Sequence, residues 1–179
     1  RQGRALRIHE SSIRVIGRTS MGVHAMKLQP GDELIDMSRL EEGQQILAIT
    51  TGGYGKRTDP DQYREQGRNG MGIRAMALTD RTGELAAQLA VDVNEDIMLI
   101  TDDGTIIRMA VSDIRESGRN TQGVRLMRLS EGAKIVGVAR AEQEEPEEAD
   151  EAAFEEAVAK MTDETETVVD GSDGGDEEI

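Results

Sequence analysis

Short apolar runs, each followed by a threonine and a turn signal, recur along residues 1–140. Residues 46–49 and 97–100 are the clearest of these runs. An apolar run of this length that ends at a turn is typical of a buried β-strand. After the second run, Asp102, Asp103 and Gly104 have the composition of a hairpin turn, because glycine adopts a positive φ at little steric cost. The pattern therefore predicts a strand, a tight turn and a return strand over residues 105–111.

Further short strands are predicted beyond this hairpin. A longer polar loop covers residues 112–122, and apolar positions return over residues 124–129 and 134–139. Four short strands within about 50 residues are the content of one blade of a propeller-like fold. The pattern thus predicts an all-β chain built from blades of four short strands.

A sequence repeat supports this prediction. Residues 3–28, 53–78 and 104–129 align at a period of 50 and then 51 residues, and eight of the 26 aligned positions are identical in all three segments. A period in this range indicates a repeat architecture. The identical positions are Gly3/Gly53/Gly104, Arg7/Arg57/Arg108, Arg14/Arg64/Arg115, Gly17/Gly67/Gly118, Arg18/Arg68/Arg119, Gly22/Gly72/Gly123, Met26/Met76/Met127 and Leu28/Leu78/Leu129.

The repeat divides a predicted domain of residues 1–141 into three units. These units cover about residues 1–45, 46–95 and 96–141. Residue 1 aligns with residue 51, so the first unit lacks the strand that residues 46–49 supply to the second. We therefore expect about three propeller-like blades, truncated at the N-terminus, and interpret the chain as a fragment that begins inside a blade. Because blades bury their faces against neighbours, a short array has exposed end surfaces.

Charge is distributed unevenly along the chain, whose formal net charge is −15. Residues 141–179 carry 17 acidic residues and one lysine, whereas residues 1–140 carry 19 acidic and 20 basic residues, 17 of them arginine. Because so acidic a segment buries little apolar surface, we expect residues 142–179 to form a mostly disordered tail. Two interpretations of the tail remain open: it solubilises the protein, or it competes as a tethered polyanion for the arginine-rich body.

Composition argues against several classes of function. Only Tyr54, Tyr63 and Phe154 are aromatic, which argues against a protein that stacks single-stranded bases on aromatic rings. The absence of cysteine excludes disulfides and thiolate metal sites, and two histidines leave little for a metal site or a catalytic triad. No apolar run approaches the roughly 18 residues of a membrane span, and no secretory leader is visible. We expect a soluble, cytoplasmic protein whose residues carry no catalysis, bind no cofactor or metal and contact no membrane.

The loop of each unit repeats a pattern in which two glycines five residues apart enclose an arginine. The enclosed arginines are Arg18, Arg68 and Arg119. We expect the first glycine to permit a sharp turn, which exposes the arginine and several backbone N–H groups as donors to phosphate oxygens. In a single unit, turns would explain the glycines, and solvation or pairing with Glu65 and Glu116 would explain the arginines. Three copies at fixed spacing favour binding of a polyanion.

Other basic residues recur beside these loops, and together they suit the backbone of a duplex. Contacts of this kind are indifferent to base sequence and depend on salt, with a slope of roughly −0.9 per neutralised phosphate and of roughly −5 to −8 for three units. The candidate DNA-contacting residues are Arg14, Arg18, Lys56, Arg57, Arg64, Arg68, Arg74, Arg108, Arg115, Arg119 and Arg125.

Several of these segments closely resemble the C-terminal domain of the bacterial DNA gyrase A protein. The resemblance rests on the GYGKRT segment of residues 53–58, the three Gly-Arg loops and the run of residues 118–129, and it covers about residues 1–140. It implies a β-pinwheel, a propeller-like disc of six blades that wraps double-stranded DNA around its outer edge and supports ATP-dependent negative supercoiling. The three units would be the last blades of that disc, and the acidic tail also fits the family.

The resemblance also implies partners and an absence of catalysis in these residues. The partners would be double-stranded DNA, the rest of the gyrase A protein and the gyrase B protein, in a heterotetramer whose other regions bind ATP and Mg. The DNA-cleaving tyrosine belongs to a region outside this chain, so Tyr54 and Tyr63 are not candidates for that role. The family's QRRGGKG box has a partial counterpart at residues 66–72, which match at Gln66, Arg68, Gly70 and Gly72.

Two other interpretations remain open at this point. The chain could be the C-terminal domain of the equivalent protein of topoisomerase IV. The blades of that domain are usually fewer and their sequence motifs more degenerate, so the three well-kept motifs here favour gyrase. The chain could also be a propeller scaffold that binds proteins. Scarce aromatic residues and repeated arginines weigh against the scaffold, because protein-binding hot spots favour tryptophan and tyrosine as well as arginine.

Overall fold

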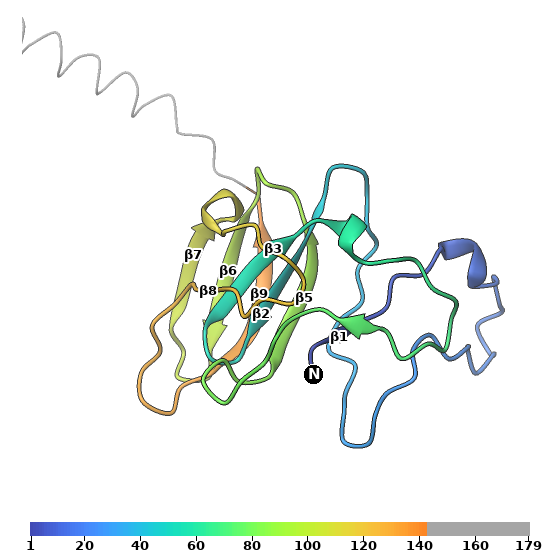
Figure 1. The fold of residues 1–179 in the computed structure, drawn as a ribbon, viewed down its shortest axis with the longest axis horizontal. Helices are drawn as coiled ribbons and strands as arrows, with labels where there is room; N and C mark the ends of the chain where they lie inside the picture. The colour runs from blue at the N-terminus through green and yellow to red at the C-terminus, as the bar shows by residue number, and fades with distance from the viewer. Residues whose placement is uncertain (143–179) are drawn as a thin grey trace, which may run out of the picture. The chain divides into compact units, whose positions relative to one another are not determined.

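The computed structural model describes residues 1–142, and the expectation of a disordered tail concerns residues that lie outside this range except for Glu142. Nine β-strands and three 3₁₀ turns form the regular structure of the described part (Figure 1). The strands are β1 (Arg4–Ala5), β2 (Gln45–Thr50), β3 (Tyr54–Thr58), β4 (Ile73–Arg74), β5 (Leu85–Val91), β6 (Asp96–Thr101), β7 (Ile106–Ala110), β8 (Val124–Arg125) and β9 (Ile135–Ala141). The 3₁₀ turns are η1 (Glu10–Ser12), η2 (Pro60–Gln62) and η3 (Val111–Asp113). The predicted all-β class is confirmed.

The second and third units each build a sheet around a central strand. In the second unit β2 pairs antiparallel with β3 and β5, and in the third β6 pairs antiparallel with β7 and β9. These central strands contain the predicted runs at residues 46–49 and 97–100, which are confirmed as buried strands. The predicted hairpin turn between β6 and β7 is also present, with Gly104 at a φ of 85°.

The fourth strand of each of these units leaves its own sheet. β4, from the second unit, pairs with β1 of the first unit, and β8, from the third unit, pairs with β3 of the second. The sheet of the second unit therefore has the strand order β5-β2-β3-β8, whereas the sheet of the third unit has the order β7-β6-β9. Successive units are linked by an exchanged strand, which the sequence pattern does not predict.

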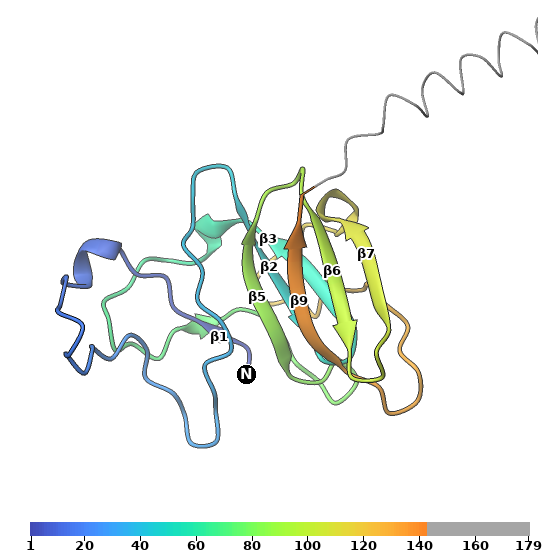
Figure 2. The same ribbon diagram turned by 180° about the vertical axis from the view of Figure 1, so that it is seen from behind.

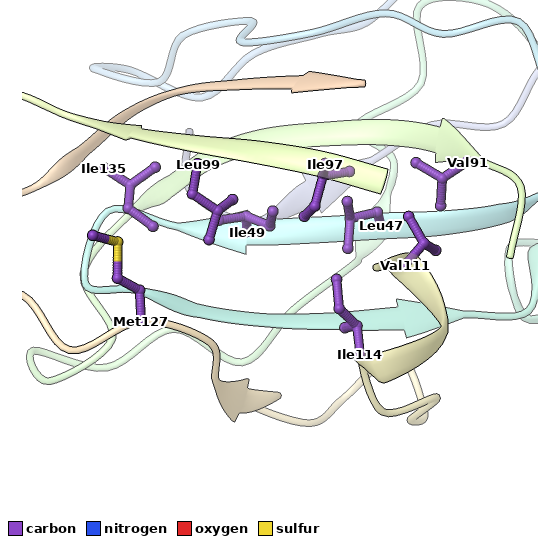
Figure 3. Close-up of a cluster of buried hydrophobic side chains, with 9 residues drawn as sticks. All are labelled: Leu47, Ile49, Val91, Ile97, Leu99, Val111, Ile114, Met127 and Ile135. Carbon is purple, nitrogen blue, oxygen red and sulfur yellow. The ribbon is translucent and has the colours of Figure 1, made fainter. Parts of the chain in front are cut away.

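The sheets of the second and third units pack face to face around the main hydrophobic core (Figures 2 and 3). Leu47 and Ile49 of β2 lie in one buried cluster with Ile97 and Leu99 of β6. The cluster is completed by Val91, Val111, Ile114, Met127 and Ile135. Burying an aliphatic side chain of this size stabilises the fold by about 1.5–3 kcal/mol relative to leaving it exposed. The core therefore holds the two units together and fixes the loops that leave their sheets.

The first unit contributes only β1 to the sheets, and residues 13–44 contain no strand. Val15, Met21 and Met37 of this segment keep most of their surface in solvent. Within the described part of the chain, no helix is long and apolar enough to cross a lipid bilayer.

The strand predicted over residues 124–129 is shorter in the structure, where β8 covers only Val124–Arg125. It ends there because the amides of Leu126 and Met127 both turn to the carbonyl oxygen of Gly53, at 2.9 and 3.3 Å. The return strand predicted over residues 105–111 is β7, and Val111 already begins η3.

Candidate functional site

The Gly-Arg loops of the second and third units lie at two equivalent junctions between units. At the first junction the loop leads from η2 to β4, where Arg74 pairs in register with Arg4 of β1. At the second junction the loop leads from η3 to β8, where Arg125 pairs in register with Tyr54 of β3. Arg74 and Arg125 hold the same position in the repeat, and both are exposed. The exchanged strands therefore present one exposed arginine at the same place in each junction.

The second glycine of the loop, rather than the first, requires a residue without a side chain. Gly72 and Gly123 have positive φ values of 67° and 73°. A Cβ atom on Gly72 would collide with the backbone of Ala5, and one on Gly123 with the backbone of Gly55. Gly67, a first glycine, has no positive φ and open space around it. A tight turn does open at the first glycine, since the carbonyl oxygens of Gly17 and Gly118 accept from the N–H groups of Ser20 and Thr121 at 3.0 and 3.1 Å. The close approach of two units, which leaves no room for a side chain, occurs at the second glycine.

Most of the predicted basic residues are exposed, while Arg57 and Arg119 are half-buried and Lys56 is buried. The exposed candidates are Arg14, Arg18, Arg64, Arg68, Arg74, Arg108, Arg115 and Arg125. Arg108 is already engaged, because its Nε donates to Asp96 at 2.7 Å and its Nη2 to the carbonyl oxygen of Glu142 at 2.7 Å. The exposed set therefore supplies guanidinium groups to solvent from all three units.

Pairing with Glu65 and Glu116 does not account for these arginines. Within residues 1–142, neither glutamate forms an ion pair with an arginine. Glu116 instead accepts a hydrogen bond from Nε2 of Gln45 at 2.8 Å. The simpler explanation of the repeated arginines as partners of these carboxylates is therefore not supported.

Arg57 donates hydrogen bonds across the second junction. Its Nε donates to the carbonyl oxygen of Ile114 at 2.6 Å, and its Nη2 to that of Ser112 at 3.2 Å. Arg7, the same position in the first unit, donates to the carbonyl oxygens of Pro60 and Tyr63 at the equivalent turn. These arginines hold the 3₁₀ turn of the following unit, so little of the Arg57 guanidinium is left for a ligand.

Among the candidate residues, Lys56 departs most from the expected position on the surface. Its side chain has no exposed area, and Nζ donates to the carbonyl oxygens of Gly118 at 2.8 Å and Arg119 at 2.6 Å. A third acceptor, Oγ1 of Thr121, lies at 3.5 Å. Burial, assisted by the positive charge of Arg119, lowers the pKa of Lys56 from 10.5 to about 8. Lys56 therefore faces the loop of the third unit and not the solvent, which corrects its assignment as an exposed DNA contact.

The low pKa of Lys56 predicts a pH dependence of stability. Between pH 8 and 10.5 the unfolded chain keeps the Lys56 proton while the folded chain has lost it, so the free energy of unfolding should rise with pH. The rise is at most about 1.4 kcal/mol per pH unit for one proton. Urea denaturation across this range should show the rise in the wild type relative to Lys56→Met. Parallel curves for the two proteins would mean that the folded-state pKa is ordinary.

Arg119 and Arg74 are brought together by the second junction. Nη1 of Arg119 donates to the carbonyl oxygen of Arg74 at 2.5 Å, and its backbone N–H donates to Oε1 of Gln62 at 3.0 Å. The guanidinium of Arg119 is thus anchored on one side, and it keeps further N–H donors for an anion. The loop of the third unit and β4 of the second unit therefore form one basic surface.

Tyr54 contacts two further guanidinium groups. The Cζ atoms of Arg81 and Arg125 lie 5.3 and 5.5 Å from the centre of its ring, within the range of a cation–π interaction. Nη2 of Arg125 also donates to the hydroxyl oxygen of Tyr54 at 3.0 Å, and this hydrogen bond lowers the pKa of Tyr54. Arg81 additionally donates to Oε1 of Gln122 at 3.1 Å.

Arg81 is absent from the predicted set, although it is exposed beside the loop of the third unit. The repeat could not reveal it, because Gly31 and Gly132 occupy the same position in the other units. Among the described residues, no group of three or more His, Asp or Glu side chains could hold a metal ion. The exposed side chains of the site offer guanidinium groups as donors to an anion.

Comparison with known proteins gives three consecutive matches to one sequence family. Residues 1–41, 44–91 and 95–142 each match the sequence family described as "DNA gyrase C-terminal domain, beta-propeller". Similar proteins include the DNA gyrase A protein of Pseudomonas aeruginosa, 42% identical over 141 residues, and that of Streptomyces coelicolor, 40% identical over 131 residues. These alignments cover 79% and 73% of this chain, but it spans only 15% of the length of either relative.

Two solved structures share the fold. The DNA gyrase A C-terminal domain aligns with a TM-score of 0.73 at 23% identity, covering 78% of this chain and 48% of that one. The C-terminal domain of DNA topoisomerase IV aligns with a TM-score of 0.74 at 24% identity, covering 87% of this chain and 49% of that one. At these identities the structural likeness concerns the arrangement of strands.

Proposed function

Because the chain belongs to the DNA gyrase C-terminal domain family, we propose that residues 1–142 bind double-stranded DNA without sequence preference and wrap it along the arginine-bearing loops. The wrapping supports ATP-dependent negative supercoiling by a type II topoisomerase. In that assembly the partners of this chain are the rest of the gyrase A protein and the gyrase B protein, and other regions hold ATP and Mg.

One observation carries the proposal: exposed arginines recur at equivalent positions of both junctions. Arg64/Arg115 and Arg74/Arg125 are exposed pairs that the repeat relates to one another. Arg68 and Arg119 also correspond in the repeat, with Arg68 exposed and Arg119 half-buried. Guanidinium groups at regular intervals match a ligand whose phosphates also recur at regular intervals. Phosphate contacts carry no base information, so selectivity among DNA molecules arises from how easily they bend.

Duplex binding is tested by a salt titration of the whole 179-residue chain. Fluorescence anisotropy with two labelled duplexes of unrelated sequence should give equal affinities and a log–log salt slope of roughly −5 to −8. A slope near zero, or a strong preference for one duplex, would contradict the proposal. A protein-binding scaffold, the interpretation from another class, would show no salt-dependent binding to either duplex.

Wrapping is tested separately from binding. A nicked plasmid is sealed by ligase in the presence and absence of the chain, and the linking number of the deproteinised product is read on a gel. Wrapping with a fixed hand should shift the distribution of topoisomers in one direction as protein is added. An unshifted distribution at saturating protein would limit the function to binding.

Gyrase is favoured over topoisomerase IV as the parent enzyme. The similar curated proteins named above are gyrase A proteins, at 40–42% identity, whereas the two solved structures, at 23% and 24% identity, share the fold equally and do not separate the two enzymes. Grafting this chain onto a gyrase A protein in place of the matching segment should preserve negative supercoiling. A graft that only relaxes DNA would favour the topoisomerase IV alternative.

A further inference from the structure

Two buried polar side chains of β3 hold the Gly-Arg loop of the third unit. Thr58 donates through Oγ1 to the carbonyl oxygen of Ser117 at 3.0 Å. Lys56, two residues earlier in the strand, donates to the next two carbonyl oxygens, those of Gly118 and Arg119. Three consecutive carbonyl groups of the loop are therefore bound by donors from one strand of the preceding unit.

The first junction lacks this arrangement. Leu6 and Ile8 stand where β3 has Lys56 and Thr58, so neither position can donate a side-chain hydrogen bond. The methyl group Cδ1 of Leu6 packs instead against Gly70, which occupies the position of Thr121. Arg4 holds this loop further along, because its Nε and Nη2 donate to the carbonyl oxygens of Met71 and Gly72 at 3.0 and 3.2 Å. The two loops thus have the same glycine and arginine pattern, but within residues 1–142 only the loop of the third unit is bound at the carbonyl of its arginine.

A buried ammonium group is rarely retained without a partner, because its desolvation is costly unless several acceptors surround it. Among the described residues, no carboxylate lies within ion-pair distance of Lys56, and its acceptors are the loop carbonyls and the hydroxyl of Thr121. The same loop is tied on its outer side by the Arg119 contacts to Gln62 and Arg74. The loop is therefore held at both sides in one conformation.

We propose that Lys56 is a positioning residue, which holds the loop of residues 118–121 and thereby makes Arg119 a stronger phosphate anchor than its repeat partner Arg68. The inference rests on the proposed function, because the ligand of Arg119 is the DNA backbone. A guanidinium that is already held loses less conformational freedom on binding than one that is not. Arg68 is exposed and, within residues 1–142, has no polar side-chain contact that would fix it in the same way.

The test compares Lys56→Met with the matched control Lys134→Met, which removes one exposed ammonium group outside the loops. Binding of the full chain to a duplex is measured as a function of salt. Lys56→Met should flatten the log–log slope by about 0.9, the loss of one phosphate contact, as Arg119→Ala should. Lys134→Met and Arg68→Ala should change the slope less. The double variant Lys56→Met/Arg119→Ala should bind no more weakly than Arg119→Ala alone, because both changes remove the same contact.

A second readout is independent of DNA. Hydrogen exchange of the Arg119 and Thr121 amides, which donate to Gln62 and Gly118, should accelerate in Lys56→Met and not in Lys134→Met. The variant Lys56→Leu/Thr58→Ile/Thr121→Gly reproduces the residues of the first junction at these three positions. It keeps apolar packing, so it replaces Lys56→Met in the test if that variant unfolds. In the triple variant the contribution of Arg119 to DNA binding should fall to that of Arg68.

Amine acylation separates positioning from direct contact. Lys27 and Lys134 are exposed and should react, whereas Lys56 should stay unmodified with or without DNA. A reactive Lys56 that DNA protects would overturn the inference, since Lys56 would then be a phosphate ligand. An unchanged slope and unchanged exchange in Lys56→Met would overturn it as well. If the wild type does not bind duplex DNA at all, the proposed function fails, while the exchange result still decides whether Lys56 holds the loop.

Discussion

Replacing both Arg68 and Arg119 by glutamate should flatten the salt dependence of duplex binding by about 1–2 slope units. Each change removes a guanidinium from equivalent loops and adds a carboxylate that repels phosphate. The affinity should fall at least about tenfold at low salt, where counterion release contributes most. Fluorescence anisotropy across a range of salt concentrations measures both quantities in the same experiment.

A matched control separates this local effect from the change in net charge. Arg39→Glu with Lys134→Glu reverses two exposed charges outside the Gly-Arg loops, and its slope should stay close to that of the wild type. If the two double variants bind DNA equally well, the loops are not the contact surface and attraction depends on overall charge alone. An unaltered slope in Arg68→Glu/Arg119→Glu would likewise remove these residues from the interface.

Gly123→Ala should destabilise the protein far more than Gly118→Ala, although both glycines belong to one loop. Alanine at position 123 would have to adopt a φ of 73°, a strain of about 1–3 kcal/mol. Its Cβ would also collide with the backbone of Gly55 in β3, which cannot move without breaking the pairing with β8. At position 118 a Cβ would meet only the side chain of Gln62, at an ordinary 3.7 Å.

Urea denaturation gives the free energy of unfolding of both variants. We expect a loss of more than about 2 kcal/mol for Gly123→Ala and less than about 1 kcal/mol for Gly118→Ala. Similar losses would show that the second junction tolerates separation of β3 and β8. Gly72→Ala and Gly67→Ala repeat the comparison at the first junction, where a Cβ on Gly67 has open space.

The strands could be predicted from the sequence because their signals are local. The apolar runs at residues 46–49 and 97–100 and the turn at Gly104 each reflect a few adjacent side chains, and the repeat shows that the same unit recurs. The exchange of β4 and β8 could not be predicted, because two-residue strands carry no periodicity and pair with residues of another unit. Which sheet such a strand joins is decided by packing between units.

The candidate site also contains features that the sequence predicts and features that only the folded structure reveals. Exposure of Arg68, Arg74 and Arg125 agrees with the repeat, since equivalent positions of equivalent units share an environment. Lys56 is the main departure, because lysine is almost never fully buried and only the folded junction supplies its acceptors. Arg81 cannot be predicted from the repeat, because its counterparts are glycines and its partner Tyr54 lies in a different part of the unit.

The exchanged strand also determines whether one unit of the repeat can fold without its neighbour. β8 is encoded in the third unit yet completes the sheet of the second, so the sequence period and the cooperative folding unit do not share a boundary. A cut at the period boundary, between residues 95 and 96, would leave β3 without its neighbour on one side. Blades of this kind are therefore expected to melt in concert with the next one and to be duplicated or transplanted only together with the first half of their successor.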